Sequence, residues 1–139
     1  MMDLMSDLCR IGVAIDEDLL GQFDGLLERK GYSNRSEAFR DLIRDALVRE
    51  ETTDPEREAV GTLTLVYDHH VRQLADKLTD MQHDHFREII STLHVHMDHD
   101  NCLEVLVLRG RAGAIRRIAD KLVSTKGVKH GRLTLTTAG

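Results

Sequence analysis

The first pattern along the chain is a strict alternation of residue types near its N-terminus. In residues 8–15, LCRIGVAI, every second position is apolar: Cys9, Ile11, Val13 and Ile15. A period of two predicts a β-strand with one apolar face. Because a lone strand is not stable in water, and because no second strand follows nearby, we expect this strand to pair with one from another chain.

The next two segments have helical spacing. Residues 16–30 carry one apolar stripe, begin with acidic residues, end with basic ones and are followed by Gly31, which together predict a helix. For the helix after it, Ser33 or Asn34 can act as the N-cap, with Glu37 as the capping-box partner. Residues 1–50 therefore form a predicted strand–helix–helix module.

The pattern changes after a charged stretch at residues 51–60, which holds the only proline and is predicted to be a linker. Beyond it, the spacing predicts strands and helices in the order β-α-β-β-α-β, at 61–67, 69–82, 87–97, 102–109, 111–126 and 128–136. This order is that of the ferredoxin-like split unit. The expected fold class is α+β: a ribbon–helix–helix module at 1–50 and a ferredoxin-like (ACT-type) domain at 61–139.

Composition and charge narrow the class of protein. Of the 139 residues, 41% are hydrophobic and 31% are charged, and the formal net charge is −5. These values are typical of a soluble globular protein and argue against a general nucleic-acid coat protein, which would be basic. No apolar run approaches the roughly 18 residues that span a bilayer. Since the start of the chain also lacks a signal-peptide pattern, we expect a cytoplasmic protein with reduced cysteines and no membrane partner.

The first module is typical of DNA recognition. Two copies that pair their strands would form an antiparallel ribbon, which fits the major groove of B-DNA. With NRSEAFRDLIRDAL after the strand, the module resembles the ribbon–helix–helix family. The resemblance implies that outward strand residues touch bases and that the start of the second helix holds phosphate. These roles would fall on Arg10, Gly12 and Ala14, and on Ser33, Asn34, Arg35 and Ser36.

The charge of this module leaves an alternative open. The first fifty residues hold seven Lys and Arg against eleven Asp and Glu, so attraction to phosphate must be local or weak. Arg10 can contact guanine with two hydrogen bonds, whereas Gly12 and Ala14 offer no hydrogen-bonding side chain. The alternative interpretation is a module that only dimerises.

Three imidazoles and a thiol lie within nine positions of the second module: His94, His96, His99 and Cys102. If the turn is centred on DHDN, near-symmetric pairing places His96 opposite Cys102 and His94 opposite Glu104, so that His94, His96 and Cys102 share one face. Imidazole and thiolate suit borderline or soft metals. A closed tetrahedral set would suit zinc and a planar set nickel or copper(II), and the spacing does not decide between them.

The other histidines have less definite roles. His99, in the turn, is more typical of a solvated residue than of a ligand. His69 and His70 begin the helix predicted at 69–82, either as a polar pair or as ligands. His83, in DMQHDHFRE, is a candidate fourth ligand from the same or a neighbouring chain.

The two modules together resemble the nickel-responsive regulator family NikR, most specifically in GYSNRSEAFRDLIR, TLHVHMDHDNCLE and GVKHGRL. The resemblance implies a homotetramer, a dimer of dimers, with Ni(II) held in a plane at a subunit interface. It implies the ligands His94, His96, Cys102 and, from another subunit, His83, with Glu104 orienting a ligand. It also implies a second, weaker cation site with Glu37 and Asp41, and a phosphate contact from Arg72.

The expected function is that of a nickel-responsive, DNA-binding transcriptional regulator that represses nickel uptake, and not that of an enzyme. The alternative is a nickel-binding oligomer that buffers or relays metal, with weak or non-standard DNA recognition, which Gly12 and Ala14 favour. A zinc hydrolase would need an open coordination position and a general base such as Glu104 or Asp98.

Overall fold

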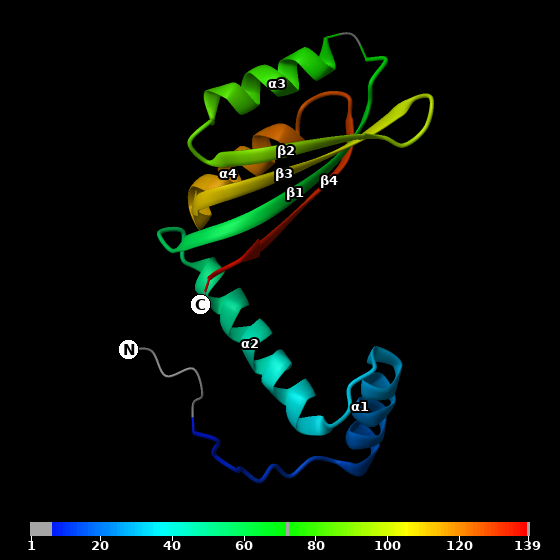
Figure 1. Ribbon diagram of the computed structural model, residues 1–139, viewed down its shortest axis with the longest axis vertical. Helices are drawn as coiled ribbons and strands as arrows, with labels where there is room; N and C mark the ends of the chain where they lie inside the picture. Colours follow the sequence, from blue (N-terminus) through cyan, green and yellow to red (C-terminus); the bar gives the residue numbers. More distant parts are fainter. Residues whose placement is uncertain (1–6, 72, 139) are drawn as a thin grey trace. The chain divides into compact units, whose positions relative to one another are not determined.

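The structure, a computed structural model, describes residues 7–71 and 73–138 and divides the chain into two compact units, Met1–Ile43 and Arg44–Gly139. The order of elements is α1, α2, β1, α3, β2, β3, α4 and β4 (Figure 1). The expected α+β class is confirmed, and so is the β-α-β-β-α-β order of the second module.

The first unit consists of α1 and the beginning of α2. Helix α1 spans Glu17–Lys30 and ends at Gly31, whose φ of 78° is the left-handed conformation that glycine adopts most readily. Helix α2 spans Arg35–Thr53. The side chain of Asn34 accepts a hydrogen bond of 2.9 Å from the backbone N–H of Glu37, which confirms the predicted N-cap.

Contacts within the first unit hold the start of α2 against α1. The rings of Phe23 and Phe39 lie 5.0 Å apart between centroids, within the range of favourable aromatic pairs. The guanidinium group of Arg35 donates two hydrogen bonds, of 2.9 and 2.8 Å, to the carboxylate of Asp24. This bidentate pair fixes the turn between the two helices.

The strand predicted at residues 8–15 is absent: residues 7–16 have no regular secondary structure. The physical reason is that a β-ladder needs a second strand, and the described part of this single chain offers none to this segment. Its apolar side chains remain exposed, Leu8, Ile11 and Val13 among them. The segment that carries the alternating pattern could therefore form a strand only by pairing with a strand of a partner chain.

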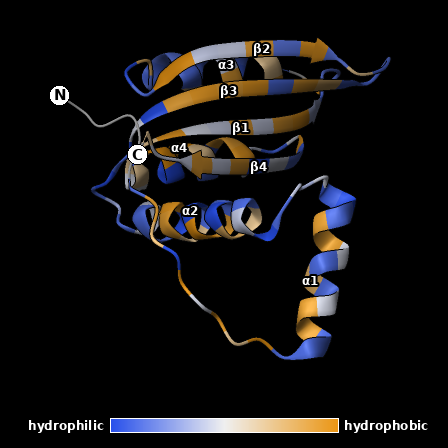
Figure 2. Cartoon of the chain, turned by 60° about the horizontal axis from the view of Figure 1, so that its bottom comes forward, coloured by the Kyte–Doolittle hydropathy of each residue, from blue (hydrophilic) through white to orange (hydrophobic). Residues whose placement is uncertain are grey.

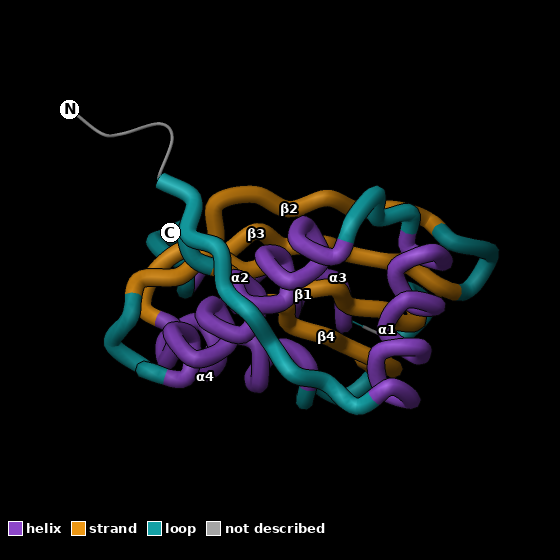
Figure 3. Tube along the Cα trace, turned by 90° about the horizontal axis from the view of Figure 1, so that it is seen from below, coloured by secondary structure: helices purple, strands orange, loops and turns teal. Residues whose placement is uncertain are grey.

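The second unit is built on one four-stranded sheet. Strands β1 (Glu58–Asp68), β2 (Ile89–His96), β3 (Asn101–Arg111) and β4 (Val128–Thr136) lie in the order β2-β3-β1-β4, as Figures 2 and 3 show. Each neighbouring pair is antiparallel. This is the arrangement that the β-α-β-β-α-β order produces when the two halves interleave.

The core of this unit lies between one face of the sheet and the helices α3 (Leu74–Asp84) and α4 (Ala112–Val123). Along β1 and β3, buried residues on this face alternate with less buried residues on the opposite face. The fully buried members come from strands and helices alike: Leu63, Leu65, Leu78, Leu106, Leu108, Ile115 and Leu122. Aliphatic side chains thus make up most of the core, as the scarcity of aromatic residues requires.

The opposite face of the sheet is also apolar. Leu93 and Val95 of β2 are 60% and 42% exposed, and they pair with Val105 and Leu103 of β3. Figure 2 shows the hydrophobic stretch along β3. A sheet with one covered and one solvated face usually has polar residues on the solvated side, so this face is unusual for a single chain.

Two predicted boundaries were wrong. Helix α2 continues to Thr53 and β1 begins at Glu58, so regular structure occupies much of the linker expected at 51–60. The reason is tertiary: Arg116 of α4 donates a hydrogen bond to the carbonyl oxygen of Thr52, near the end of α2. That contact satisfies a helix C-terminal carbonyl that would otherwise lack a partner.

Helix α3 begins at Leu74, not near residue 69. The side chain of Asp68 accepts a hydrogen bond of 2.8 Å from the N–H of His70, a local bond that competes with helix formation. Gln73, just before the helix, has a left-handed φ of 62°. The chain therefore turns after β1 before α3 starts, and His69 and His70 lie in a loop.

Candidate metal centre

The strand register brings the predicted metal ligands together in pairs. His96 lies opposite Cys102 and His94 opposite Glu104, which confirms the pairing expected from the sequence. The sulfur of Cys102 is 3.5 Å from Nδ1 of His96. Cross-strand partners share one face of a sheet, and here it is the face that carries the core, since Cys102 and Glu104 are both buried.

Glu104 binds the second imidazole. Its side chain is 1% exposed, and its Oε1 lies 2.9 Å from Nε2 of His94. The same oxygen accepts a hydrogen bond of 3.0 Å from the side-chain amide of Gln82, on α3. A buried carboxylate on a histidine ring can orient that ring. This is the role that the family resemblance implied for Glu104, and it stays a prediction.

Tyr67 lies on the other side of His94. Its hydroxyl group is 3.5 Å from Nδ1 of His94. Burial raises the pKa of Tyr67 to about 12, and the nearby Glu104 and Cys102 add to the shift. The phenol therefore stays protonated at neutral pH and keeps its O–H group on the side of the histidine.

The donor set fits a borderline metal, although one chain does not complete it. In the parts of the chain that the structure describes, His94, His96 and Cys102 do not form a group of three ligand atoms within 4.8 Å of one another. The His94 side chain is 55% exposed. His83, near the end of α3, is exposed and has no described contact with the other three. Two imidazoles and a thiol facing one way match the ligands that nickel, copper and zinc prefer.

The residues predicted for a second cation site are engaged locally. The carboxylate of Glu37 accepts a hydrogen bond of 3.0 Å from the Ser33 hydroxyl, and that of Asp41 accepts one of 2.7 Å from the Tyr32 hydroxyl. Neither belongs to a three-ligand group among the described residues. A cation role for Glu37 and Asp41 stays a prediction.

The residues predicted to touch DNA are positioned only in part. Arg10, Gly12 and Ala14 are exposed in the segment without regular structure, and Gly12 has no atom within 4 Å of an added Cβ. Arg35 is engaged with Asp24. Arg72 lies outside the described residues.

A group of side chains that the sequence interpretation treated as minor does come together. Ligand atoms of His70, His99 and Asp100 lie within 4.8 Å of one another, and all three residues are exposed. From its position in the sequence, His70 was expected at the start of a helix, either as a polar residue or as a ligand, and His99 was expected to be a solvated turn residue. The signal that could have joined them is the pairing of β1 with β3, which places the end of β1 beside the β2–β3 turn.

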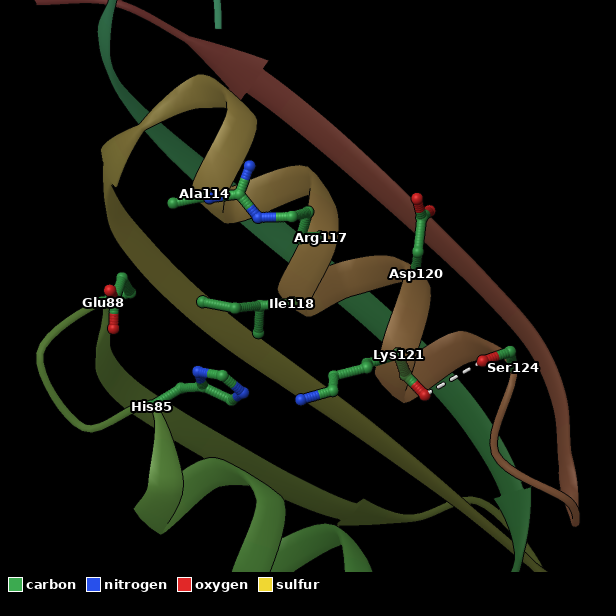
Figure 4. Close-up of a pocket in the computed structure, with 8 residues that line it drawn as sticks. All are labelled: His85, Glu88, Ala114, Arg117, Ile118, Asp120, Lys121 and Ser124. Atoms are coloured by element: carbon green, nitrogen blue, oxygen red, sulfur yellow. Dashed lines mark hydrogen bonds between the residues drawn. The ribbon is translucent and has the colours of Figure 1, made fainter. Parts of the chain in front are cut away.

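A cavity of about 670 Å³ lies elsewhere, between α4 and the segment after α3 (Figure 4). Its lining includes His85 and Glu88 on one side and Arg117, Lys121 and Ser124 on the other. None of the residues predicted to bind metal or DNA lines it. The candidate metal centre is a separate group of side chains on the paired strands β2 and β3.

Comparisons with known families match both units. The family described as "NikR C terminal nickel binding domain" matches residues 60–136, and "Ribbon-helix-helix protein, copG family" matches residues 10–50. Relatives named as nickel-responsive regulators include those of Solibacter usitatus, 67% identical, and Geobacter sulfurreducens, 61% identical, each over 97% of both chains. An uncharacterized protein of Thermotoga maritima shares the fold over 56% of this chain and 96% of its own, with a TM-score of 0.51 and 16% identity.

A ribbon–helix–helix module joined to a metal-binding sheet domain defines a class of metal-responsive transcriptional regulators. The matches cover nearly all of the chain at high identity. The chain belongs to the NikR family of nickel-responsive regulators, and it is not an enzyme. Among the described residues, no helix is long and apolar enough to cross a membrane.

Proposed function

We propose that the chain represses nickel uptake by binding operator DNA when Ni(II) is present, with nickel held by His94, His96, Cys102 and His83 of a second subunit. The observation that carries this proposal is the pairing of His96 with Cys102 at 3.5 Å, beside a His94 ring held by the buried Glu104. In this proposal, His94, His96 and Cys102 of one chain and His83 of another would hold the ion, and Glu104 would orient the His94 ring.

Oligomer formation is part of the proposal, because one chain does not gather all the donors. The open face of the sheet exposes Leu93, Val95 and Met97, an apolar surface of the kind that marks a protein–protein contact. The first unit exposes further apolar residues on the unpaired segment 7–16 and on α1 and α2. These two surfaces support a homotetramer in which strand-paired dimers associate through the sheet domains.

Nickel acts in this scheme as an effector. A ligand shifts a protein toward the conformation that it binds more tightly. A site completed by two chains exists only in those subunit arrangements that bring the donors of both chains together. Nickel would thereby favour the one in which the paired ribbons reach DNA. Because the thiol must be deprotonated and the imidazoles neutral, nickel affinity should fall as the pH is lowered.

DNA contacts are proposed at the outward positions of the strand segment and at the start of α2: Arg10, Gly12, Ala14, Ser33, Asn34, Arg35 and Ser36. A second candidate function, a nickel-binding oligomer with weak or non-standard DNA recognition, is favoured by a specific observation. Arg35 is paired with Asp24, and the side chains of Gly12 and Ala14 offer no hydrogen-bonding group. DNA recognition would then depend mainly on Arg10 and on backbone amides.

Nickel titration followed by electronic absorption tests the metal site. We expect a thiolate-to-nickel charge-transfer band with the wild-type chain, lost in Cys102→Ala and in His83→Ala. His130→Ala is the control, since His130 is an exposed histidine outside the proposed ligands. An octahedral spectrum without the band would contradict the site.

Selection from randomised duplex DNA, with and without nickel, tests the readout. The repressor proposal expects an enriched sequence that depends on nickel and is lost in Cys102→Ala. Nickel binding without any enriched sequence would leave the buffering oligomer as the function.

A further inference from the structure

The cavity beside α4 has one wall formed by a helix face. Ala114, Arg117, Ile118 and Lys121 follow the three- and four-residue spacing that brings side chains to the same side of a helix. Ile118 belongs to the core, is 3% exposed and lies between the two basic side chains, as Figure 4 shows. This wall thus presents an apolar patch with a cation on either side.

The other wall is the turn between α3 and β2. The backbone carbonyl oxygen of His85 accepts hydrogen bonds of 3.1 Å from the N–H of Glu88 and 3.0 Å from that of Ile89. The carbonyl oxygen of Glu88 accepts one of 2.8 Å from the N–H of Arg109, on β3. Because these bonds fix the backbone, a hydrogen-bonded turn presents the side chains of His85 and Glu88 to the cavity.

The charged groups of the cavity have no partners within the described chain. Among the residues that the structure describes, the side chains of Arg117, Lys121 and Glu88 take part in no hydrogen bond or ion pair. The neighbouring Arg116, by contrast, donates a hydrogen bond to the carbonyl oxygen of Thr52. The two cations that line the cavity are therefore available to an external anion.

The cavity has the size of a small-molecule site. Its volume of about 670 Å³ lies within the range of about 300–1,000 Å³ that is typical of ligand pockets. Its lining includes α4, which covers the core side of the sheet, whereas Leu93 and Val95 belong to the open face. The cavity is therefore distinct from the apolar surface proposed for assembly.

We propose that this cavity binds a small organic anion. Arg117 and Lys121 hold its carboxylate or phosphate group, since guanidinium and ammonium groups form charge-assisted hydrogen bonds with both. Ile118 contacts its carbon skeleton, and Glu88 accepts a hydrogen bond from a hydroxyl or amino group at its other end. The site needs no metal and shares no residue with the proposed nickel ligands, so it does not depend on the proposed function.

Isothermal titration calorimetry of the metal-free full chain tests the proposal with two probes that share a hydroxylated three-carbon skeleton. Glycerol 3-phosphate carries a phosphate group and glycerate a carboxylate, so the comparison identifies the anionic group. We expect at least one probe to bind, and to bind at least tenfold more weakly when Arg117→Gln and Lys121→Gln are combined. Lys126→Gln, at an exposed position outside this cavity, should leave the affinity unchanged.

Titration with inorganic phosphate measures how much of the binding depends on charge alone. Phosphate should bind at least tenfold more weakly than the better probe, because it has no carbon skeleton for Ile118 to contact. Glu88→Ala should weaken binding of the organic probe without weakening that of phosphate. Because Arg117 and Lys121 are exposed, the double variant should keep the circular dichroism spectrum of the wild-type chain. Binding of neither probe, equal binding of phosphate, or full affinity in the double variant would overturn the proposal.

Discussion

Glu104 is almost fully buried in the second unit, yet its Oε2 has no hydrogen-bond partner among the described residues. Burial of a carboxylate is costly unless the group is paired. His94 and Gln82 both contact the other oxygen, Oε1, and offset part of that cost. Burial of the Glu104 carboxylate costs free energy, and the carboxylate contacts a candidate ligand, His94. Orientation of that ligand therefore explains the buried position of Glu104 better than a contribution to stability does.

The change Glu104→Gln separates these two roles. The shape is kept, but the amide is neutral and holds the His94 ring less strongly, so nickel affinity should fall about 10–100-fold. The free energy of unfolding should change little or rise, because a buried charge is removed. Competition against a nickel chelator and urea unfolding measure the two effects. Glu58→Gln, at an exposed strand position, should alter neither, and a large loss of stability in Glu104→Gln with unchanged affinity would contradict the assignment.

Tyr67 makes stability depend on pH in the alkaline range. Burial raises its pKa from 10.0 to about 12, so the folded state holds the phenolic proton more tightly than the unfolded state. Its contribution is fully present below pH 10 and is lost as the pH rises toward 12. We expect the free energy of unfolding to fall over that window, and to fall less steeply in Tyr67→Phe. Equal slopes in both proteins, measured by urea unfolding at several pH values, would rule out this source.

At the scale of elements, the period of the apolar residues predicted which segments form helices and strands. Tertiary contacts decided where several of these elements begin and end. The helix at 16–30 was predicted almost to the residue, since its stop signal, Gly31, is local. The start of α3 was not predicted correctly. The hydrogen bond to Asp68 and the left-handed conformation of Gln73 turn the chain, so the helix begins only at Leu74. The strand at 8–15 is missing because its partner belongs to no segment of the described chain.

Substitutions at two glycines of the first unit test how far local backbone conformation determines stability at these positions. Gly31→Ala places a side chain at φ 78° and should lower stability by about 1–2 kcal/mol. Gly21→Ala, inside α1 with nothing within 4 Å of the added Cβ, should raise stability by about 0.5–1 kcal/mol. Thermal unfolding monitored by circular dichroism measures both, and changes of the same sign would contradict the conformational explanation.

At the scale of the whole molecule, the open face of the sheet leaves apolar side chains such as Leu93 and Val95 in contact with solvent. Stable interfaces bury on the order of 1,200–2,000 Å² of surface in total. An exposed sheet face is a surface of the kind that can contribute one partner's half of that area. The proposed nickel site needs donors from a second chain, so assembly and metal binding should be coupled.

The variant Leu93→Asp tests that coupling. A charge at an apolar contact costs desolvation energy, so the oligomer should dissociate to a smaller species in light scattering. Nickel affinity should fall in the same variant although no proposed ligand is changed. Lys126→Glu, at an exposed position outside this face, is the matched control. An intact oligomer in Leu93→Asp would place the interface elsewhere.

The sequence by itself determined most of the helices and strands of the second unit and the pairing of His96 with Cys102. Both depend on local rules: the period of apolar residues fixes which segments form helices and strands, and a short polar turn fixes the register of the two strands that it joins. Only the tertiary structure decided that Glu104 is buried and contacts Gln82 of α3, and that His70 meets His99 and Asp100. Those contacts join segments far apart in the chain, and their positions depend on how the whole sheet pairs and packs.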